Sequence, residues 1–211
     1  MKNFETPLAI TMGDPSGIGP EIILKSVVET KLNNFVVFGD SLVFDSLIKN
    51  LGLPLTINKI SEPSEAIFEG NYFNLFETSK LNHLPHYGKI SKECGKASFD
   101  AIMKSIELAK QGKVSGIVTA PISKKALNLA HINYPGHTEI LAGYSNNKAV
   151  SMMLLNKHIK TVLVTLHCSM KQALDRITIK NELDAIINAN LGCKLFGIEK
   201  PVIAVAALNP H

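Results

Sequence analysis

Short β-branched apolar runs alternate with helix-like segments along this chain, and this alternation is the feature that most restricts its fold. Leu8–Met12, Phe35–Phe38 and Gly116–Ala120 have the composition of buried strands. Segments of helical periodicity lie between such runs, for example the stretch Ala97–Ala109 before the helix-stopping Gly112. Strands that alternate with helices favour parallel pairing through right-handed crossovers. The sequence therefore predicts an α/β fold with parallel strands.

The same alternation continues in the second half of the chain. Val150–Leu155, Thr161–Leu166 and Val202–Leu208 are predicted as strands, and a helix is predicted from Thr178 to Lys194. Residues 53–90 are less periodic, and only short strands are expected there. Most of the predicted elements thus belong to one strand-and-helix pattern.

Two of the apolar runs are followed by a histidine. His167 comes directly after Thr161–Leu166, and His211 follows Val202–Leu208 after an Asn-Pro pair. Parallel strands of one sheet end at the same edge, where α/β proteins bind their ligands. Neutral imidazole is a good ligand for divalent metal ions. From the residues alone, a metal site and two hydrogen-bonded structural histidines remain equally open.

Composition excludes several classes of protein. The formal net charge is +4, from 22 basic and 18 acidic residues, but no Lys/Arg block occurs and Arg176 is the single arginine. This pattern argues against a nucleic-acid partner. No apolar run approaches the roughly 18 residues of a membrane span. The three cysteines are odd in number and far apart, which favours a reducing compartment, and the protein is predicted to be cytoplasmic.

Two predicted strand ends carry polar groups. Gly13–Glu21 is a glycine-rich turn before a helix, which can present backbone N–H groups to an anion. It lacks the spacing of a dinucleotide fingerprint and the lysine of a P-loop, so a tight structural turn is the alternative. In Thr119–Lys124, Ser123 is suited to capping a helix. The ammonium group of Lys124 is suited to binding a carboxylate, a phosphate or a developing alkoxide.

A further polar pair lies in the segment Tyr134–Glu139. Its Pro-Gly dipeptide fixes a turn, which places His137 and Thr138 on an exposed loop that enters a helix. These side chains are a suitable pair for substrate oxygens. Thr138 could equally cap the helix, with Glu139 in its first turn.

Five motifs can be read in order along the whole chain: Thr11–Glu21, Val118–Lys124, Gly136–Glu139, Thr165–His167 and Leu208–His211. Together they resemble the 4-hydroxythreonine-4-phosphate dehydrogenases of pyridoxal phosphate synthesis. The resemblance implies an α/β fold like that of isocitrate and isopropylmalate dehydrogenases, with two α/β/α domains and a cleft between them. It places the first domain at residues 1–130 and the start of the second at residues 131–211. It also implies that the C-terminal portion is missing.

The resemblance assigns roles to individual residues. His137 and Thr138 match substrate-binding positions, and His167 with His211 match two of three metal-ligating histidines. The third lies beyond residue 211, and in the family the other subunit of a homodimer completes the metal site. Lys124 is a candidate for assisting proton transfer. Residues that bind the cofactor are not identified.

The activity implied is NAD(P)-dependent oxidation of 4-phosphooxy-L-threonine at its secondary alcohol, followed by decarboxylation to 3-amino-2-oxopropyl phosphate. A divalent ion such as zinc, cobalt or magnesium would lower the pKa of the alcohol and stabilise the enolate formed on loss of CO₂. The expected partners are a small phosphorylated amino acid, NAD or NADP, and a second copy of the protein.

Two other functions remain open. A paralogous dehydrogenase of erythronate or threonate 4-phosphate would share this chemistry. Alternatively, the chain as it stands is an inactive fragment or a module that binds a metal or ligand without turnover, because it ends three residues after its last predicted strand. Residues 1–211 alone are expected neither to hold the metal tightly nor to turn over substrate.

Overall fold

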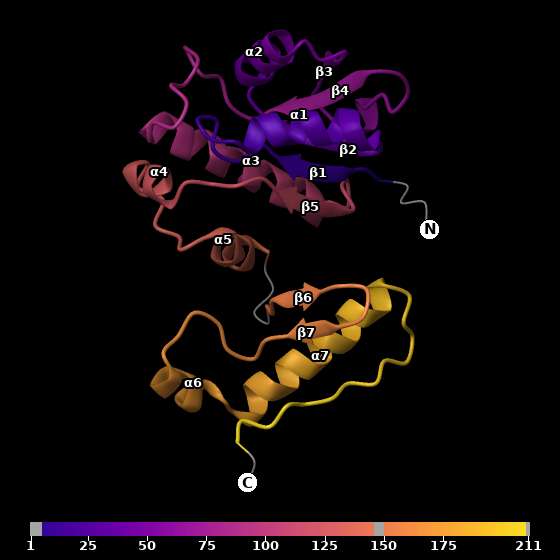
Figure 1. The fold of residues 1–211 in the computed structure, drawn as a ribbon, viewed down its shortest axis with the longest axis vertical. Coiled ribbons are helices and arrows are strands. Elements are labelled where there is room, and N and C mark those ends of the chain that lie inside the picture. Colours follow the sequence, from indigo (N-terminus) through magenta and orange to yellow (C-terminus); the bar gives the residue numbers. More distant parts are fainter. Residues whose placement is uncertain (1–5, 146–149, 210–211) are drawn as a thin grey trace. The chain divides into compact units, whose positions relative to one another are not determined.

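The computed structural model describes residues 6–145 and 150–209. The chain divides into two compact units, Met1–Asn146 and Asn147–His211, which we call unit 1 and unit 2 (Figure 1). Unit 1 extends beyond residue 130, where the sequence placed the end of the first domain, because α5 (His137–Tyr144) packs against α3 (Lys92–Lys110). The domain limits of the intact protein remain a prediction.

Unit 1 is built on a five-stranded sheet in which every strand pair is parallel, in the order β3-β4-β2-β1-β5. Its strands are β1 (Leu8–Thr11), β2 (Phe35–Gly39), β3 (Thr56–Ile60), β4 (Tyr72–Glu77) and β5 (Gly116–Thr119). Its other helices are α1 (Gly19–Thr30), α2 (Ser41–Leu51), α4 (Lys124–Leu129) and the 3₁₀ turn η1 (Pro63–Glu65). The predicted α/β fold with parallel pairing is therefore confirmed for this unit.

Helices cover both faces of the sheet (Figure 1). Ile10 and Val37 pack with the apolar residues of α1 and α2 in one core cluster. Ala9 and Val36 point the other way and pack with α3. This alternation follows from the strand period of two, and it explains why β2 is buried at every position.

The strand ends of unit 1 are aligned. Thr11 at the end of β1 pairs with Phe38 of β2 and with Thr119 of β5. The segments that follow these strands therefore emerge at one edge of the sheet, its carboxyl edge. In parallel sheets this edge is where ligands bind.

Unit 2 differs from the predicted arrangement. Its two strands, β6 (Met153–Leu155) and β7 (Lys160–Val162), form an antiparallel hairpin. The helices are α6 (Met170–Arg176) and α7 (Ile179–Leu195). The helix predicted from Thr178 to Lys194 corresponds to α7, and Thr178 is its cap. Only a short polar turn lies between these two runs in the sequence, and such a turn permits only antiparallel pairing.

The strand predicted at Val202–Leu208 is not formed. These residues have no regular secondary structure, and Val202 is fully exposed. The reason is physical: a strand requires a hydrogen-bonding neighbour, and no described residue pairs with this segment. Likewise β7 covers only the beginning of the predicted strand Thr161–Leu166.

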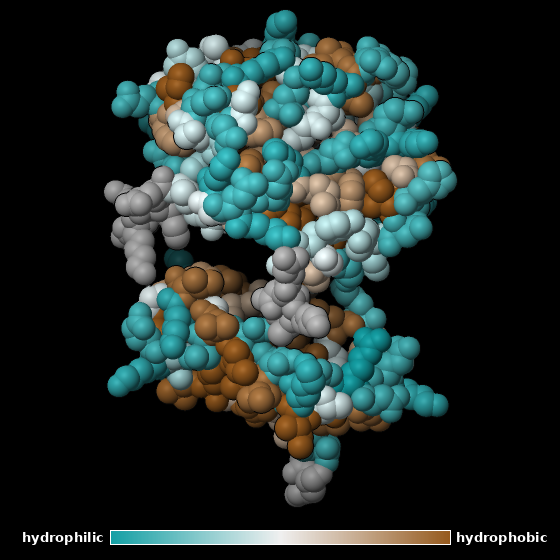
Figure 2. Space-filling model, turned by 180° about the vertical axis from the view of Figure 1, so that it is seen from behind, coloured by the Kyte–Doolittle hydropathy of each residue, from teal (hydrophilic) through white to brown (hydrophobic). Residues whose placement is uncertain are grey.

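Large apolar side chains are exposed throughout unit 2, and brown side chains gather on the face of it that Figure 2 shows. Met170 is 78% exposed, Ile179 89% and Leu195 88%. Among the described residues of this unit, the only buried members of the hydrophobic core are Ala185 and Cys193. Unit 2 is therefore poorly covered by its own residues. In the described part of the chain, none of the helices combines the length and the apolar character that crossing a membrane requires.

Candidate functional site

The glycine-rich turn after β1 packs directly on the segment that follows β5. Gly13 has a φ of +74°, and a Cβ at this position would overlap the backbone carbonyl oxygen of Pro121. The Asp14 N–H donates to the same oxygen at 2.8 Å, and the Ala120 N–H donates to the Thr11 carbonyl at 3.1 Å. Only glycine satisfies both the left-handed conformation and this close approach.

Within the turn, Asp14 bonds its own neighbours. Its Oδ1 accepts from the Ser16 backbone N–H at 2.9 Å and from the Ser16 hydroxyl at 2.8 Å. The Gly17 N–H donates to the Asp14 carbonyl at 2.9 Å. Because the N–H groups of Asp14, Ser16 and Gly17 are already used inside the protein, the geometry favours a tight structural turn over an anion-binding loop.

Lys124 is the first residue of α4. The Ser123 hydroxyl accepts from the Ala126 N–H at 3.2 Å, which confirms the predicted cap. Lys124 is exposed, and a Cβ built on Gly136 would lie 3.9 Å from its Cε. The fold thus brings Lys124 next to the turn that precedes His137.

His137 is the first residue of α5 and is partly buried. The helix is capped by Gly136, so the alternative prediction of Thr138 as the cap is wrong, although Glu139 does lie in the first turn. His137 makes a hydrogen bond to the backbone of Ala120 at the end of β5. Its Nε2 is buried and has no hydrogen-bond partner among the described residues.

Burial lowers the pKa of His137 below its ordinary value, and the hydrogen bond to the Ala120 backbone opposes this shift only in part. The imidazole is therefore neutral at neutral pH. When one ring nitrogen donates to a backbone carbonyl, the other nitrogen of a neutral imidazole is an acceptor. His137 Nε2 is thus a buried acceptor that suits a hydroxyl or ammonium donor.

The lowered pKa of His137 predicts a pH-dependent stability. The imidazole of His137 binds a proton more tightly in the unfolded chain than in the folded chain. The contribution of the neutral imidazole to the free energy of unfolding is therefore fully present above the unfolded-state pKa of about 6.5. It is lost as the pH falls through the folded-state pKa. Denaturant unfolding should therefore be measured at neutral and at mildly acidic pH. Acidification is expected to lower the free energy of unfolding less in His137→Gln than in the wild type. Equal losses in the two proteins would contradict this assignment.

His167 lies in unit 2, where it is exposed and adopts a left-handed φ of +46°. It precedes Ser169, which caps α6 through a capping box with Gln172. Non-glycine residues rarely adopt this conformation, and such strain often marks functional positions. His211 lies outside the described residues. Within the described ranges, no group of three or more His, Cys, Asp or Glu side chains is arranged to hold a metal ion.

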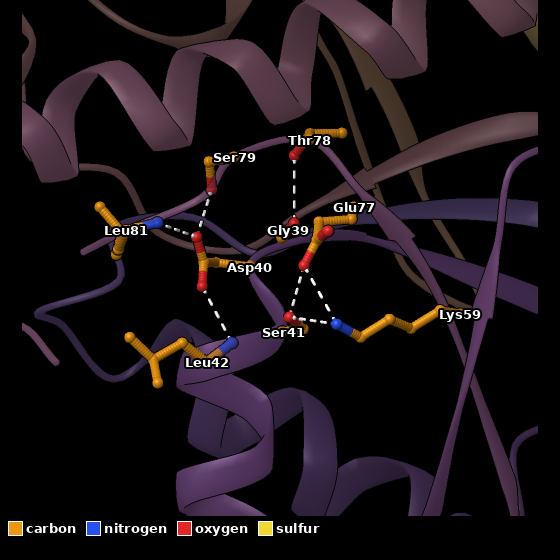
Figure 3. A network of polar contacts seen from close by, with 9 residues as sticks. All are labelled: Gly39, Asp40, Ser41, Leu42, Lys59, Glu77, Thr78, Ser79 and Leu81. Atoms are coloured by element: carbon orange, nitrogen blue, oxygen red, sulfur yellow. Dashed lines mark hydrogen bonds and ion pairs between the residues drawn. The ribbon is translucent and has the colours of Figure 1, made fainter. Parts of the chain in front are cut away.

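Sequence reasoning missed a polar network at the carboxyl ends of β2 and β4, which Figure 3 shows. Asp40 is 1% exposed, and its carboxylate accepts from the Leu42 N–H at 3.0 Å, the Ser79 hydroxyl at 3.0 Å and the Leu81 N–H at 2.8 Å. The carboxylate caps α2 and also fixes the segment after β4. The signal was present in Gly39-Asp40-Ser41, a strand end followed by a helix cap.

A second part of the network joins Ser41, Glu77 and Lys59 (Figure 3). The Ser41 hydroxyl donates to Glu77 Oε1, and Lys59 Nζ lies 2.7 Å from the Ser41 hydroxyl oxygen and 3.4 Å from Glu77 Oε1. The Ser41 hydrogen bond, with help from the charge of Lys59, lowers the pKa of Glu77. Glu77 is therefore a carboxylate that holds β4 to the start of α2.

The motifs at the strand ends of unit 1 and around His167 agree with a comparison to known protein families. Residues 31–211 match the model of the pyridoxal phosphate biosynthetic protein PdxA. The chain belongs to the PdxA family. This membership bears out the resemblance seen in the five sequence motifs.

Three individual relatives show how close the similarity is. A 4-hydroxythreonine-4-phosphate dehydrogenase of Beijerinckia indica is 48% identical over the whole chain. A Fusobacterium nucleatum protein, provisionally named a D-threonate 4-phosphate dehydrogenase, is 36% identical over 99% of the chain. The crystal structure of a 4-hydroxythreonine-4-phosphate dehydrogenase from Klebsiella pneumoniae covers 98% of the chain with a TM-score of 0.89 and 34% identity. The fold of this PdxA chain is thus that of a solved member of the family.

The chain spans only part of these PdxA relatives. It covers 63% of the Beijerinckia protein, 64% of the Fusobacterium protein and 65% of the Klebsiella chain.

Proposed function

We propose that the intact protein is an NAD(P)-dependent dehydrogenase that oxidises the secondary alcohol of 4-phosphooxy-L-threonine. The hydride passes from the carbinol carbon to the nicotinamide, and the hydroxyl proton is released. The resulting β-keto acid loses CO₂, and protonation of the enolate gives 3-amino-2-oxopropyl phosphate. The observation that carries this proposal is the 48% identity, along the whole chain, to a protein named for this substrate.

Unit 1 supplies a group suited to the substrate. His137 Nε2 is a buried acceptor with no partner among the described residues, and leaving it unpaired costs free energy that a bound ligand would recover. A neutral imidazole matches the hydroxyl or ammonium group of the substrate better than its phosphate. His137 and Thr138 would orient the alcohol, and Lys124, which lies beside the same turn, would assist the movement of its proton.

His167 and His211 are proposed as ligands of a divalent metal such as zinc, cobalt or magnesium. The donor type fits zinc and cobalt best, since imidazole ligates ions of this kind whereas magnesium prefers oxygen ligands, and His167 is exposed. The described residues supply only this one proposed ligand, so the remaining donors would come from His211 and from residues beyond it in the other subunit. When bound, the metal would supply Lewis acidity to the substrate hydroxyl.

A homodimer and an isocitrate dehydrogenase-like arrangement, with two domains and a cleft, are also part of the proposal. The support is the exposed apolar surface of unit 2, where Ile179 and Leu195 lie almost entirely in solvent. Surfaces of this kind are normally covered by further protein. In the intact protein they would be buried by the rest of the chain and by the second copy.

A D-threonate 4-phosphate dehydrogenase is the second candidate, because a relative that carries this name is 36% identical over nearly the whole chain. The two substrates differ in the group next to the alcohol, an ammonium in one and a hydroxyl in the other. Both can donate to His137, so this residue does not discriminate between them. The higher identity of the Beijerinckia relative favours the amino acid.

The test is to measure kcat/KM of the intact protein for both substrates, with NAD and with NADP and with each metal. We expect 4-phosphooxy-L-threonine to be the better substrate by at least about tenfold, because the relative named for this substrate is the more similar of the two. A preference for threonate 4-phosphate would replace the first proposal with the second. Turnover of neither substrate would contradict both.

A further inference from the structure

A cavity of about 400 Å³ lies at the amino edge of the unit 1 sheet, opposite the carboxyl edge that carries the candidate site. Phe35 and Tyr72, the first residues of β2 and β4, line it together with the end of α1 and the loop of residues 67–71. Its volume falls within the range of about 300–1,000 Å³ that is typical of sites for small molecules. Neither Lys124 nor His137 lines it, so this cavity is separate from the candidate site.

The loop that forms one wall of the cavity is held in place at both ends. The buried Asn74 side chain accepts from the Ile67 N–H at 2.9 Å and donates to the Ile67 carbonyl at 2.9 Å. Asn58 Nδ2 donates to the same Asn74 oxygen at 2.9 Å. At the other end of the loop, the Thr56 N–H donates to the Asn71 carbonyl at 2.9 Å. The wall is thus preorganised, which reduces the entropy lost on binding.

Most of the cavity lining is apolar. Val27 and Phe35 are buried members of the core, whereas Ile67 is 41% exposed, Phe68 41% and Tyr72 45%. These three large side chains are neighbours in one short segment, and all three line the same hollow. Gathered apolar surface of this kind often marks a ligand groove. A ligand with a flat apolar ring would cover it.

The charged lining of the cavity is a single lysine. Lys31 lines it, and no aspartate or glutamate does. Lys31 is exposed and makes no ion pair or hydrogen bond with another described residue, so its ammonium group is available to an anion. The carbonyl end of α1 carries about half a negative charge, which the full charge of Lys31 exceeds. The side-chain amides of Asn33 and Asn71, which also line the cavity, can donate further hydrogen bonds to oxygen atoms.

We propose that this cavity binds a small molecule that combines a flat apolar ring with one anionic group, a phosphate or a carboxylate. The ring would lie against Phe68 and Tyr72, and Lys31 with Asn71 would hold the anionic group. The inference is independent of the proposed dehydrogenase function, because it uses none of the residues assigned to that function. The ligand would bind without competing with the substrate.

The test is binding of three probes to the intact protein, measured by ligand-observed NMR titration. The probes are phenyl phosphate, benzoate and inorganic phosphate. We expect at least one of the two aromatic anions to bind at least about tenfold more tightly than inorganic phosphate, because only these bury a ring. The tighter of the two identifies the anionic group as phosphate or carboxylate.

Two variants and one control locate the bound probe. Lys31→Asn removes the charge while tolerating the left-handed φ of +51°, and it should weaken binding of the preferred aromatic anion roughly tenfold. Phe68→Glu places a carboxylate at an exposed position of the rim and should abolish binding. Lys49→Gln removes an exposed lysine of α2 that does not line the cavity, and should bind as the wild type does. Circular dichroism checks that each variant is folded, and Lys31→Asn alone decides if Phe68→Glu does not fold.

Three results would overturn the inference. The first is a wild type that binds neither aromatic anion. The second is unchanged binding in the folded cavity variants. The third is displacement of the bound probe by 4-phosphooxy-L-threonine, which would place the probe at the candidate site. Turnover of that substrate, measured separately, tests the dehydrogenase function and is expected to be unchanged in Lys31→Asn.

Discussion

Gly95→Ala is expected to destabilise the protein by about 3 kcal/mol or more, although alanine is intrinsically the better residue inside a helix. Gly95 lies in α3 where this helix meets α4, and a Cβ at this position would overlap the backbone carbonyl group of Ala126. Backbone atoms cannot rotate away as side chains do, so α3 and α4 would have to separate. Denaturant unfolding monitored by circular dichroism measures the change.

The matched control for Gly95 is Gly143→Ala in α5. There an added Cβ would lie 3.6 Å from the ring of Tyr134, which is ordinary van der Waals contact. The same substitution should therefore leave stability unchanged or raise it by up to about 1 kcal/mol. If both variants had the same effect, close packing of α3 on α4 would not be the reason for glycine at position 95.

His167→Asn in the intact protein is expected to lower kcat/KM by roughly a thousandfold or more, because a metal ligand contributes several kcal/mol to transition-state stabilisation. Asparagine tolerates the left-handed backbone that His167 adopts, so the variant should fold. The bound metal, measured by elemental analysis after gel filtration, should be lost together with the activity.

His158→Asn is the control for the metal assignment. His158 is an exposed histidine of the β6–β7 turn in the same unit, and its backbone N–H donates to Asn156 at 2.8 Å. Removing its imidazole should change neither activity nor metal content. Full metal content and activity in His167→Asn would show that position 167 is not a ligand.

The parallel sheet of unit 1 was predictable because its signals are local. Both faces of the sheet are buried, so its central strands are continuous apolar runs such as Phe35–Phe38. The helices carry their own caps, for example Ser123 before α4 and Thr178 before α7 in unit 2. Periodicity and capping are properties of neighbouring residues and need no tertiary information.

In unit 2 the prediction failed where a predicted strand has no pairing partner among the described residues. An apolar run such as Val202–Leu208 has the composition of a strand, but it forms one only where another strand provides hydrogen bonds. The direction of pairing at β6 and β7 depended on turn length rather than on composition. The expectation that two strands deliver His167 and His211 to one edge rested on both of these points. The strand before His211 is not formed, and His211 itself lies outside the described residues.

The candidate site was predictable in part. The sequence pointed to His137 through its turn and through the family resemblance, but the buried Nε2 and the contact with Ala120 depend on how β5 meets α5. The Asp40 network joins residues about 40 positions apart, Asp40 with Ser79 and Leu81. Pairing at that separation leaves no periodic signal in the sequence.

The most direct test of the proposed function uses 4-phosphooxy-L-threonine deuterated at the carbon that bears the hydroxyl group. The intact protein is incubated with this substrate and oxidised cofactor, and the products are examined by mass spectrometry. We expect the deuterium to appear in the reduced nicotinamide, with CO₂ formed in equal amount. Deuterium retained in the substrate, with no reduced cofactor and no CO₂, would contradict the assignment.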